Sequence, residues 1–579
     1  MTMLTKWGAA LDRSCPLPEY PRPQLRRESF YNLNGVWDYA VTPSGDEPGV
    51  WDGEIVVPFS PEAPLSGAAR GPAKDEYLHY RRGFTLPEGF QKSRVLLHFG
   101  AVDQIAEVFV NGVSAAKHSG GYWPFSADIT SLLREGENIL RVTVRDNADD
   151  PTFAYGKQRY ERGGMWYTAQ SGIWQTVWLE SVPEAYVKSL RITPEFDEAR
   201  VRIELETALE SSAAITCDVR AADGSFVAGS WAKGGVCVVP LPGFRAWTPD
   251  DPYLYTLDIS CGEDRVESYF AMRKFSYVEL GGHKVFGLNN VPLFHNGLLD
   301  QGYYPDGLLT PPSDEAMVND IETTKRCGFN MLRKHIKIEP LRWYYHCDRL
   351  GMIVWQDMVS GGQPYSFLHV SALPTLGKVD LPDQDAKPYG RSGVLSRARF
   401  RREMADTVRL LYNCPCIALW TVFNEGWGQF DALDMANELK KLDPTRFIDH
   451  ASGWQDQGYE EMKSRHIYFR PVKLKNDGRA LALTEYGGYI LAVDGHRWTD
   501  KVFGYRICRD SAALAHDYEK LMLGQVLPHI RKEGLTAAVY TQITDVEEEL
   551  NGLMTYDREV LKIPEETLRE INAALRFDA

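Results

Sequence analysis

Residues 328–358 read GFNMLRKHIKIEPLRWYYHCDRLGMIVWQDM, and this stretch decides the fold. Two short apolar runs, at 330–336 and 352–358, have the length and residue types of buried strands. The residues between them are enough for one helix and its turns. The stretch therefore predicts a strand–helix–strand unit.

The same alternation continues from residue 278 to residue 579. Strands are predicted at 292–299, 330–336, 352–358, 417–424, 446–452, 465–469, 480–487 and 537–544. The clearest helix is predicted over 396–412, where apolar residues recur with helical spacing from Phe400 to Leu411. Eight strands alternating with helices over about 300 residues predict a (β/α)8 TIM barrel. An open, doubly wound sheet is the alternative with the same local pattern.

The chain before residue 278 is predicted to be entirely β. From about residue 30 to 183, short strands follow one another, and Asn111-Gly112 after the strand IAEVFV is a hairpin turn signal. Residues 184–277 repeat this pattern at a spacing of 8 to 15 residues, with Asp, Gly and Pro between the strands. This second part has the length and pattern of a β-sandwich.

Composition and charge exclude several classes of protein. Hydrophobic residues make up 44% of the 579 residues and charged residues 25%, as in ordinary folded proteins. The formal charge of −15 has the wrong sign for a protein that mainly binds nucleic acid or anionic membranes. No secretory leader and no membrane-spanning apolar run is found, so we expect neither export nor membrane insertion. With nine scattered cysteines, we expect reduced thiols and a cytoplasmic location.

Polar residues close the predicted barrel strands, and the active site of such a barrel lies at these carboxyl ends. They are Asp300, His335 with Lys337, Asp357, Asn424 with Glu425, His450, His466, Glu485 and Gln542. Glu425 and Glu485 each follow a strongly apolar run, so both are expected to enter one cavity. Two carboxyl groups in a partly apolar cavity are what glycosidic bond cleavage needs, one protonated and one ionised. Either glutamate alone could instead be a solvated loop residue or an ion-pair partner.

Motifs for other chemistries are absent from the sequence. There is no HExxH, paired CxxC or EF-hand loop, so no metal is assigned, although Asp, Glu and His at the strand ends keep a metal site as a rival interpretation. No GxGxxG opens a βα unit, no Gly-rich loop ends in GK[ST], and no GxSxG is present. We therefore expect no nucleotide or other cofactor.

Asn424-Glu425 and Thr484-Glu485-Tyr486-Gly487 complete a set of motifs that resembles glycoside hydrolase family 2, which includes β-galactosidases, β-glucuronidases and β-mannosidases. The segments YRRGF (80–84), VFVNG (108–112) and SGIWQTVWLE (171–180) are similar to the strand signatures of its N-terminal domain. Residues 328–358 follow its barrel pattern. The resemblance implies a sugar-binding-type jelly roll over 1–183, an immunoglobulin-like sandwich over 184–277 and a catalytic barrel over 278–579.

The resemblance also implies roles for the motif residues. Glu425 would be the general acid/base and Glu485 the nucleophile of a retaining exo-β-glycosidase, with their carboxyl groups about 5 Å apart. Asn424 would hydrogen-bond the 2-hydroxyl of the sugar, and Tyr486 would support the nucleophile. The expected partner is a carbohydrate substrate, and a homo-oligomer is compatible with the sequence.

The sugar itself is less well defined by the sequence. The segment Asp300-Gln301-Gly302-Tyr303-Tyr304-Pro305 departs from the His-rich segment of β-galactosidases, and no Asn-x-Lys signature of β-glucuronidases occurs. The prediction is a β-galactosidase-like enzyme, with a β-uronidase or a non-catalytic carbohydrate-binding relative as alternatives. Cations that could hold a uronate are Arg333, Lys334, Lys337, Arg470, Lys473 and Arg506.

Aromatic residues, 12% of the chain, supply candidates for stacking on a sugar ring. These are Trp355, Trp420, Trp427, Trp454 and Tyr540, of which Trp420 is expected to be ordinary core. The predicted substrate-binding set is Asn424, Asp300, Arg333, His335, Lys337, Asp357, Trp355, His466, Tyr486, Trp454, Tyr540 and Gln542.

Overall fold

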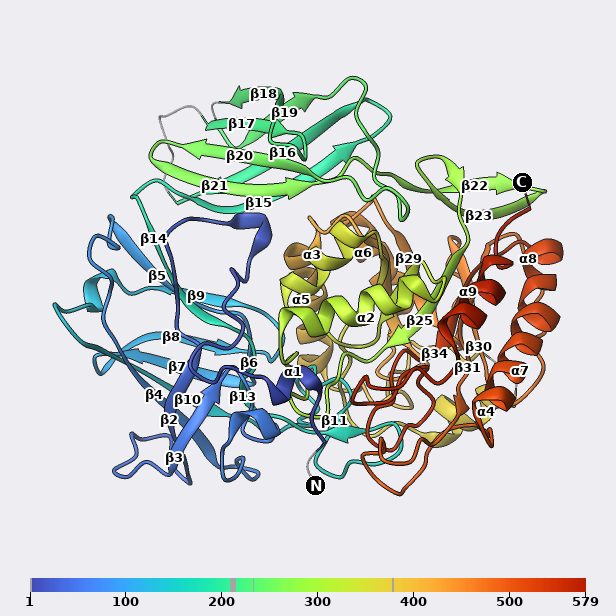
Figure 1. Ribbon diagram of the computed structural model, residues 1–579, viewed down its shortest axis with the longest axis horizontal. Coiled ribbons are helices and arrows are strands. Elements are labelled where there is room, and N and C mark those ends of the chain that lie inside the picture. The colour runs from blue at the N-terminus through green and yellow to red at the C-terminus, as the bar shows by residue number, and fades with distance from the viewer. Residues whose placement is uncertain (1–2, 209–214, 233, 377–379, 579) are drawn as a thin grey trace.

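In a computed structural model the chain forms three lobes, and the structure describes residues 3–208, 215–232, 234–376 and 380–578. Figure 1 shows an N-terminal β lobe in blue to cyan beside a barrel in yellow to red. A second β lobe, in green, lies over both. The multidomain architecture expected from the sequence is therefore present.

The N-terminal lobe is a sandwich of two antiparallel sheets. One has the order β1 (Phe30–Asn32), β14 (Val177–Val182), β5 (Arg94–Phe99) and β9 (Phe125–Asp128). The other has the order β3 (Gly53–Val57), β2 (Gly35–Thr42), β4 (Tyr77–Phe84), β10 (Asn138–Arg145), β7 (Ile105–Val110) and β8 (Val113–Ser119). β7 and β8 pair around Asn111 and Gly112, whose φ angles are 52° and 83°, so the predicted hairpin is confirmed.

The middle lobe is a seven-stranded sandwich. β15 (Val187–Glu195), β16 (Arg200–Thr207) and β19 (Val236–Pro240) form one sheet, and β18 (Phe226–Ala232), β17 (Ile215–Arg220), β20 (Tyr255–Cys261) and β21 (Asp264–Phe270) form the other. Buried and partly exposed residues alternate along β20, as expected for a strand with one face in the core.

The barrel sheet contains all eight predicted strands. Its order is β29 (Phe447–Ser452), β28 (Ile417–Asn424), β27 (Ile353–Asp357), β26 (Met331–Lys334), β25 (His295–Asp300), β34 (Leu535–Thr541), β31 (Ala480–Gly487) and β30 (Met462–Ile467). Because β25 pairs with β34, the first and last strands meet and the sheet is a nearly closed barrel rather than an open, doubly wound sheet. Every residue of β28 and β31 is buried, which explains their uninterrupted apolar runs.

Helices surround this sheet in Figure 1. They include α2 (Asp314–Arg326), α3 (Leu341–Leu350), α5 (Val394–Leu411), α6 (Ala432–Leu442), α7 (Ser511–Leu521), α8 (Leu527–Glu533) and α9 (Glu565–Ala573). The predicted helix 396–412 corresponds to α5. α3 ends at Gly351, whose left-handed φ of 72° lets the chain turn into β27 within two residues.

A hairpin of β22 (Phe275–Leu280) and β23 (His283–Leu288) closes the amino-terminal end of the barrel. Phe286 of β23 stacks on Phe447 of β29 with ring centroids 4.2 Å apart. The predicted boundary between residues 277 and 278 falls inside β22, so this hairpin spans it. All nine cysteines are free thiols and only Cys15 is exposed.

The N-terminal segment, residues 5–27, belongs to neither sheet of the first lobe and contacts all three lobes. The amide and hydroxyl of Thr5 both donate to Asp306 of the barrel at 2.7 Å. Arg27 pairs with Glu180 of the first lobe at 3.0 Å and with Asp264 of the middle lobe at 2.8 Å. These buried contacts join the lobes.

A second segment of the first lobe, residues 153–168, crosses the mouth of the barrel, and we call it the strap. It contains the short parallel pair β11 (Gln158–Arg159) and β12 (Tyr167–Thr168). One end lies on the loop after β27, where the Tyr155 amide donates to the Ser360 carbonyl at 3.1 Å. The other end lies on the loop after β34, where the Tyr167 hydroxyl donates to Glu549. The strap thus forms a wall over the carboxyl ends of the strands.

Candidate active site

The two glutamates singled out by the sequence lie beside each other at the barrel mouth. Glu425 follows β28 directly, and Glu485 lies near the end of β31. His466, near the end of β30, lies between them, with Nδ1 2.8 Å from Glu425 Oε1 and 3.5 Å from Glu485 Oε2. A ligand atom from each of the three side chains lies within 4.8 Å of the others. This spacing is close to the 5–5.5 Å carboxyl separation of retaining glycosidases.

The backbone at Glu425 fixes the direction of its side chain. Its φ of 54° is left-handed, which is uncommon for a residue other than glycine. The Glu425 amide donates to the Ser452 carbonyl at 2.9 Å, and the Trp454 indole donates to the Glu425 carbonyl at 2.9 Å. Both backbone groups are therefore held by β29 and the segment that follows it, which compensates for the unusual conformation.

Arg333, from β26, organises the floor of the site. Its side chain is fully buried and donates to both carboxylate oxygens of Asp357 at 3.0 Å. It also donates to Glu485 Oε1 at 3.1 Å, to the Thr484 carbonyl at 3.1 Å and to Asn424 Oδ1 at 2.8 Å. One guanidinium thus joins the ends of β26, β27, β28 and β31. The bond to Asn424 occupies Oδ1, so the amide N–H groups of Asn424 are not used by Arg333.

Tyr468 is a site residue that sequence reasoning missed. Its hydroxyl donates to Glu485 Oε2 at 2.5 Å. The sequence places a strand over 465–469, which makes Tyr468 an interior residue, whereas β30 ends at Ile467. Tyr468 therefore lies just beyond a strand end, the position at which functional side chains of such a barrel are expected.

The two glutamates lie in different electrostatic environments. Burial raises the pKa of Glu425 to about 7, against the opposing charges of Lys157 and Arg333. Burial also raises the pKa of Glu485, but Arg333 and the Tyr468 hydroxyl both donate to this carboxylate and favour its ionised form. Glu425 is therefore suited to carry a proton near neutral pH, whereas the donors to Glu485 favour the ionised form of that carboxylate.

Two histidines in the site are neutral. Burial lowers the pKa of both His335 and His466 to about 3. His335 Nδ1 lies 2.9 Å from Asp357, so the ring is oriented by the carboxylate that Arg333 also holds. His466 Nδ1 can accept a hydrogen bond from a protonated Glu425 or donate one to an ionised Glu425.

The structure brings part of the predicted substrate-binding set to the glutamate pair. Asn424, Arg333, His335, Asp357 and His466 lie there through the contacts described above. Trp454 lies there too, partly buried, with its ring edge-on to His466 at a centroid distance of 5.5 Å.

Other members of the set are engaged elsewhere, so their placement gives no support to direct substrate contact. Lys337 donates to Glu339 at 2.8 Å, and Asp300 pairs with Lys334 at 2.7 Å. Trp355 is fully buried deeper in the barrel, with its indole donating to His295 at 3.0 Å.

Three further members of the predicted substrate-binding set lie away from the Glu425–Glu485 pair or next to it. Tyr486 points away from the cavity, with its hydroxyl 3.1 Å from the sulfur of Met522. Tyr540 is fully buried and packs edge-on against Tyr486 at 5.8 Å. Gln542 is buried and donates to Asn551 at 2.9 Å. Trp420, expected to be core, is fully buried.

The same three atoms that define the site could also ligate a cation. An imidazole nitrogen and two carboxylate oxygens within 4.8 Å of one another are donors that divalent metals accept. The geometry of these side chains is therefore compatible with either use, and the hydrogen bonds from Arg333 and Tyr468 to Glu485 favour an unmetallated carboxylate.

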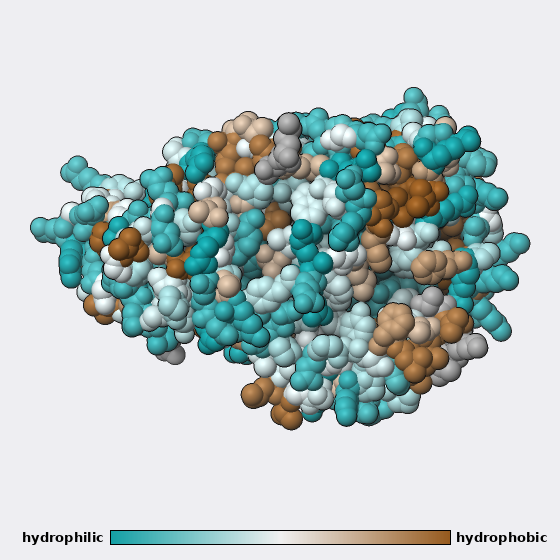
Figure 2. Space-filling view, turned by 90° about the horizontal axis from the view of Figure 1, so that it is seen from below, coloured by the Kyte–Doolittle hydropathy of each residue, from teal (hydrophilic) through white to brown (hydrophobic). Residues whose placement is uncertain are grey.

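Exposed hydrophobic side chains lie on the segments that follow the barrel strands. They include Phe367, Leu368 and Leu376 after β27, Phe469 after β30, and Ile507 after β31. Figure 2, which shows the molecule from below relative to Figure 1, has separate hydrophobic clusters on the half occupied by the barrel. These segments thus offer exposed apolar surface on the barrel.

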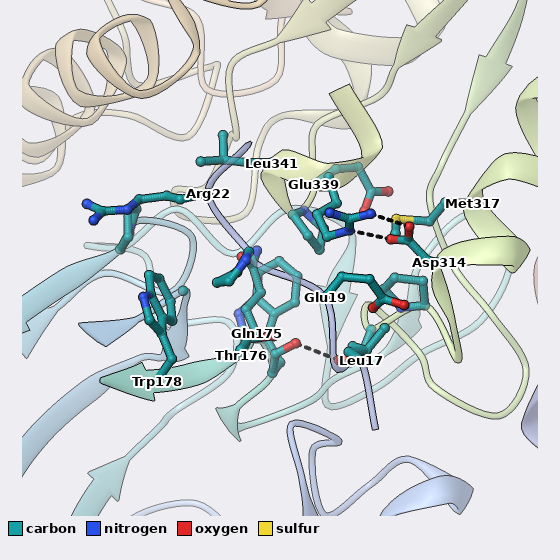
Figure 3. Close-up of a pocket in the computed structure, with 18 of the residues that line it drawn as sticks. Leu17, Glu19, Arg22, Gln175, Thr176, Trp178, Asp314, Met317, Glu339 and Leu341 are labelled. Atoms are coloured by element: carbon teal, nitrogen blue, oxygen red, sulfur yellow. Dashed lines mark hydrogen bonds and ion pairs between the residues drawn. The ribbon is translucent and has the colours of Figure 1, made fainter. Parts of the chain in front are cut away.

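A separate cavity lies between the lobes and does not contain the glutamate pair. It has a volume of about 80 Å³ and is lined by the N-terminal segment, the first lobe and the barrel. Figure 3 shows Arg22 and Trp178 on one side of it and Asp314 and Met317 on the other. It is a gap at a junction of lobes, away from the strand ends that carry the candidate chemistry.

Comparisons with known proteins agree with this architecture. Family models match residues 64–183 ("Glycosyl hydrolases family 2, sugar binding domain"), 185–273 ("Glycosyl hydrolases family 2") and 312–474 ("Glycosyl hydrolases family 2, TIM barrel domain"). Among solved structures, a beta-glucuronidase from an uncultured Clostridium sp. superposes with a TM-score of 0.74 at 18% identity, covering 95% of this chain and 98% of that one. A beta-galacturonidase from Eisenbergiella tayi gives 0.70 at 18% identity, covering 97% and 100%.

The match to several curated relatives covers a smaller share of their own length. A beta-galactosidase from Thermoanaerobacter pseudethanolicus is 25% identical over 63% of this chain and 47% of its own length. A beta-glucuronidase from Paenibacillus borealis is 22% identical over 82% of this chain and 85% of its own. The chain spans less than half the length of the first curated relatives it matches. No helix in the described part of the chain is long and apolar enough to cross a membrane. Because three models of one family match in chain order and together cover more than half of the sequence, the chain belongs to glycoside hydrolase family 2.

Proposed function

We propose that the protein is a retaining exo-β-glycosidase that hydrolyses terminal β-linked sugars through a covalent glycosyl-enzyme. The observation that carries this proposal is the placement of Glu425 and Glu485 at the ends of β28 and β31, with carboxylate oxygens within 4.8 Å. Retaining enzymes need this short separation because one carboxylate itself attacks the sugar.

In the first step Glu485 attacks the anomeric carbon while Glu425 protonates the departing oxygen. Arg333 and Tyr468 each donate to a different oxygen of Glu485, which orients the carboxylate and keeps it ionised. The raised pKa of Glu425, about 7, lets it carry the proton near neutral pH. Asn424, oriented by Arg333, is placed to bind the 2-hydroxyl.

In the second step Glu425 deprotonates the water that releases the sugar. Once Glu485 is esterified, its negative charge no longer raises the pKa of Glu425, so Glu425 becomes ionised and can act as a base. The water attacks from the side opposite Glu485, and the configuration at the anomeric carbon is retained overall.

The sequence predicts a β-galactosidase-like glycone, and a β-uronide is the second candidate. Relatives named beta-galactosidase and beta-glucuronidase support both, and solved structures of similar fold are named beta-glucuronidase and beta-galacturonidase. The strap over the mouth favours release of a terminal sugar, since it walls one side of the site.

The test is a panel of chromogenic β-galactoside, β-glucuronide, β-galacturonide and β-mannoside substrates. Proton NMR of the first product formed should show the β-anomer. Glu485→Ala should abolish turnover without changing the unfolding temperature by more than a few degrees, and azide should partly rescue Glu425→Ala as a β-glycosyl azide. An α-product would refute retention, and no turnover of any β-glycoside would refute the activity. Loss of activity on chelation would instead support the metal use of the site.

A further inference from the structure

The strap places one lysine at the mouth of the barrel. Gly156, with its amide donating to the Ser360 carbonyl at 3.0 Å, lies so close to the barrel that a Cβ there would be 3.0 Å from the Ile336 carbonyl. Lys157 follows it, and its own carbonyl accepts from the Tyr167 amide at 2.9 Å. The backbone of Lys157 is therefore fixed on both sides, next to the end of β26.

The side chain of Lys157 lies against an aromatic pair beside Glu425. It is 9% exposed, and its ammonium lies 5.5 Å from the ring centroid of Trp166. Trp166 in turn packs edge-on against Trp427, two residues after Glu425, with centroids 5.1 Å apart. Burial raises the pKa of both Glu425 and Glu549, and the positive charge of Lys157 lowers both, so Lys157 lies within electrostatic range of these two acids.

Lys157 differs from the other cations of the strap in having no ion-pair partner among the described residues. Arg159 pairs with Asp149 at 3.5 Å, and Arg162 pairs with Glu547 at 3.4 Å. Among the residues that the structure describes, no carboxylate lies within 4.0 Å of the Lys157 ammonium and no acceptor is bonded to it. The Lys157 side chain is largely buried while its ammonium has no counter-ion, so a bound anion would give this charge a partner.

The cations that the sequence offered for this purpose are less suitable. Arg333 and Lys334 are already paired with buried carboxylates of the barrel, and Lys337 with Glu339. Arg470 and Lys473 are exposed. Arg506 is exposed and pairs with Asp517. Lys157 lies in a different lobe and was not among them.

We propose that Lys157 forms an anion-binding subsite of the active site and receives a carboxylate of the substrate. The inference rests on the proposed glycosidase function. The carboxylate can belong to the sugar, as in a β-linked uronide, or to the group that leaves. In either case an N–H of the ammonium donates to the carboxylate in a charge-assisted bond, which is strong in a site from which water is excluded.

The test compares substrates that differ only in one carboxylate. The 4-nitrophenyl β-glucuronide is paired with the β-glucoside, and the β-galacturonide with the β-galactoside, because each pair differs only at C6. A 3-carboxy-4-nitrophenyl β-galactoside against its 4-nitrophenyl counterpart places the charge on the leaving group. kcat/KM is measured for the wild type, Lys157→Met and Lys157→Arg. Lys117→Met is the matched control, since Lys117 is an exposed lysine of the same lobe.

We expect the wild type to prefer the acidic member of at least one pair. Lys157→Met should lower kcat/KM for that member by about 30-fold or more, the loss typical of truncating one side of a buried charge pair. It should change the neutral member by less than about threefold, and Lys157→Arg should recover most of the loss. The pair that responds shows whether the carboxylate belongs to the sugar or to the leaving group.

Equal losses on acidic and neutral substrates, or a wild-type preference for the neutral member of every pair, would overturn the subsite. If the wild type turns over no β-glycoside, the glycosidase proposal fails, and binding decides the subsite separately. At least one of glucuronate, galacturonate and the acidic leaving group 3-carboxy-4-nitrophenol should then raise the unfolding temperature of the wild type and of Lys117→Met but not of Lys157→Met. Equal shifts in all three proteins, or none, would contradict an anion site at Lys157.

Discussion

Replacement of Arg333 by lysine tests the organisation of the site most directly. The change keeps one positive charge at the floor of the barrel but removes the planar fork. Arg333 makes five hydrogen bonds, two to Asp357 and one each to Glu485, Asn424 and the Thr484 carbonyl. A lysine ammonium has three N–H groups, so at least two of the five bonds are lost.

The magnitude follows from these bonds. Each hydrogen bond to a charged group contributes about 1.5–3 kcal/mol, so two losses cost about 3–6 kcal/mol, a large share of the usual 5–15 kcal/mol of folding stability. If the bond to Glu485 is among them, its absence alone lowers kcat/KM by about 10- to 150-fold. The pKa of Glu485 should rise because a donor to its ionised form is missing, and the acidic limb of the pH profile should then move to higher pH.

Arg446→Lys separates the catalytic loss from the loss of stability. Arg446 also makes five hydrogen bonds and is 2% exposed, but it precedes β29 at the opposite end of the barrel. Both variants should unfold at lower temperature in calorimetry, and only Arg333→Lys should lose kcat/KM and shift the acidic limb. Equal kcat/KM in Arg333→Lys and the wild type would refute the view that Arg333 positions Glu485 for attack.

Three further predictions follow from the same contacts. kcat/KM should fall about tenfold per pH unit above pH 7, because the pKa of Glu425 is about 7. This basic limb of the pH profile should disappear in Glu425→Gln. If the limb persists in that variant, a group other than Glu425 causes it. Tyr468→Phe should move the acidic limb to higher pH and lower kcat/KM about tenfold, because Glu485 loses a hydrogen-bond donor. An unchanged pH profile would contradict the role of Tyr468 as a donor to Glu485. Arg27→Met should lower the free energy of unfolding, measured by denaturant titration, by about 3–5 kcal/mol and leave kcat/KM unchanged. Arg27 pairs with carboxylates of two lobes and does not contact the active site. Unchanged stability would argue against a role of Arg27 in joining these lobes.

The barrel was predictable from the sequence because its signals are local. An apolar run such as IALWTVF, bounded by polar residues, defines a strand without reference to the rest of the chain. The rule that sites lie at the carboxyl ends of strands then led to Glu425, Glu485, His335, Asp357 and His466. That rule works because the ends of parallel strands meet at one edge of the barrel.

Direction along a strand explains the residues that were less well predicted. Tyr486 follows Glu485 in β31, and successive side chains point to opposite faces, so Tyr486 must face the helices when Glu485 faces the cavity. Trp355 shares a face with Asp357 in β27 but lies one layer deeper. Tyr468 was missed through a strand end displaced by two residues. The placement of these residues depends on face and register, which composition and periodicity resolve poorly.

Lys157 was missed for a different reason, since no local pattern connects a loop of the first lobe with a barrel that begins more than a hundred residues later. The barrel alone holds Glu425 and Glu485, to which we assign bond cleavage, and Arg333, which holds Glu485. The strap adds a wall and, on our proposal, the charge that selects an acidic substrate. Bond cleavage and substrate selection then reside in different lobes. Substitutions in the strap should therefore change which glycoside is preferred while the acidic limb set by Glu485 stays in place. Substitutions at the strand ends should instead lower turnover of every glycoside alike.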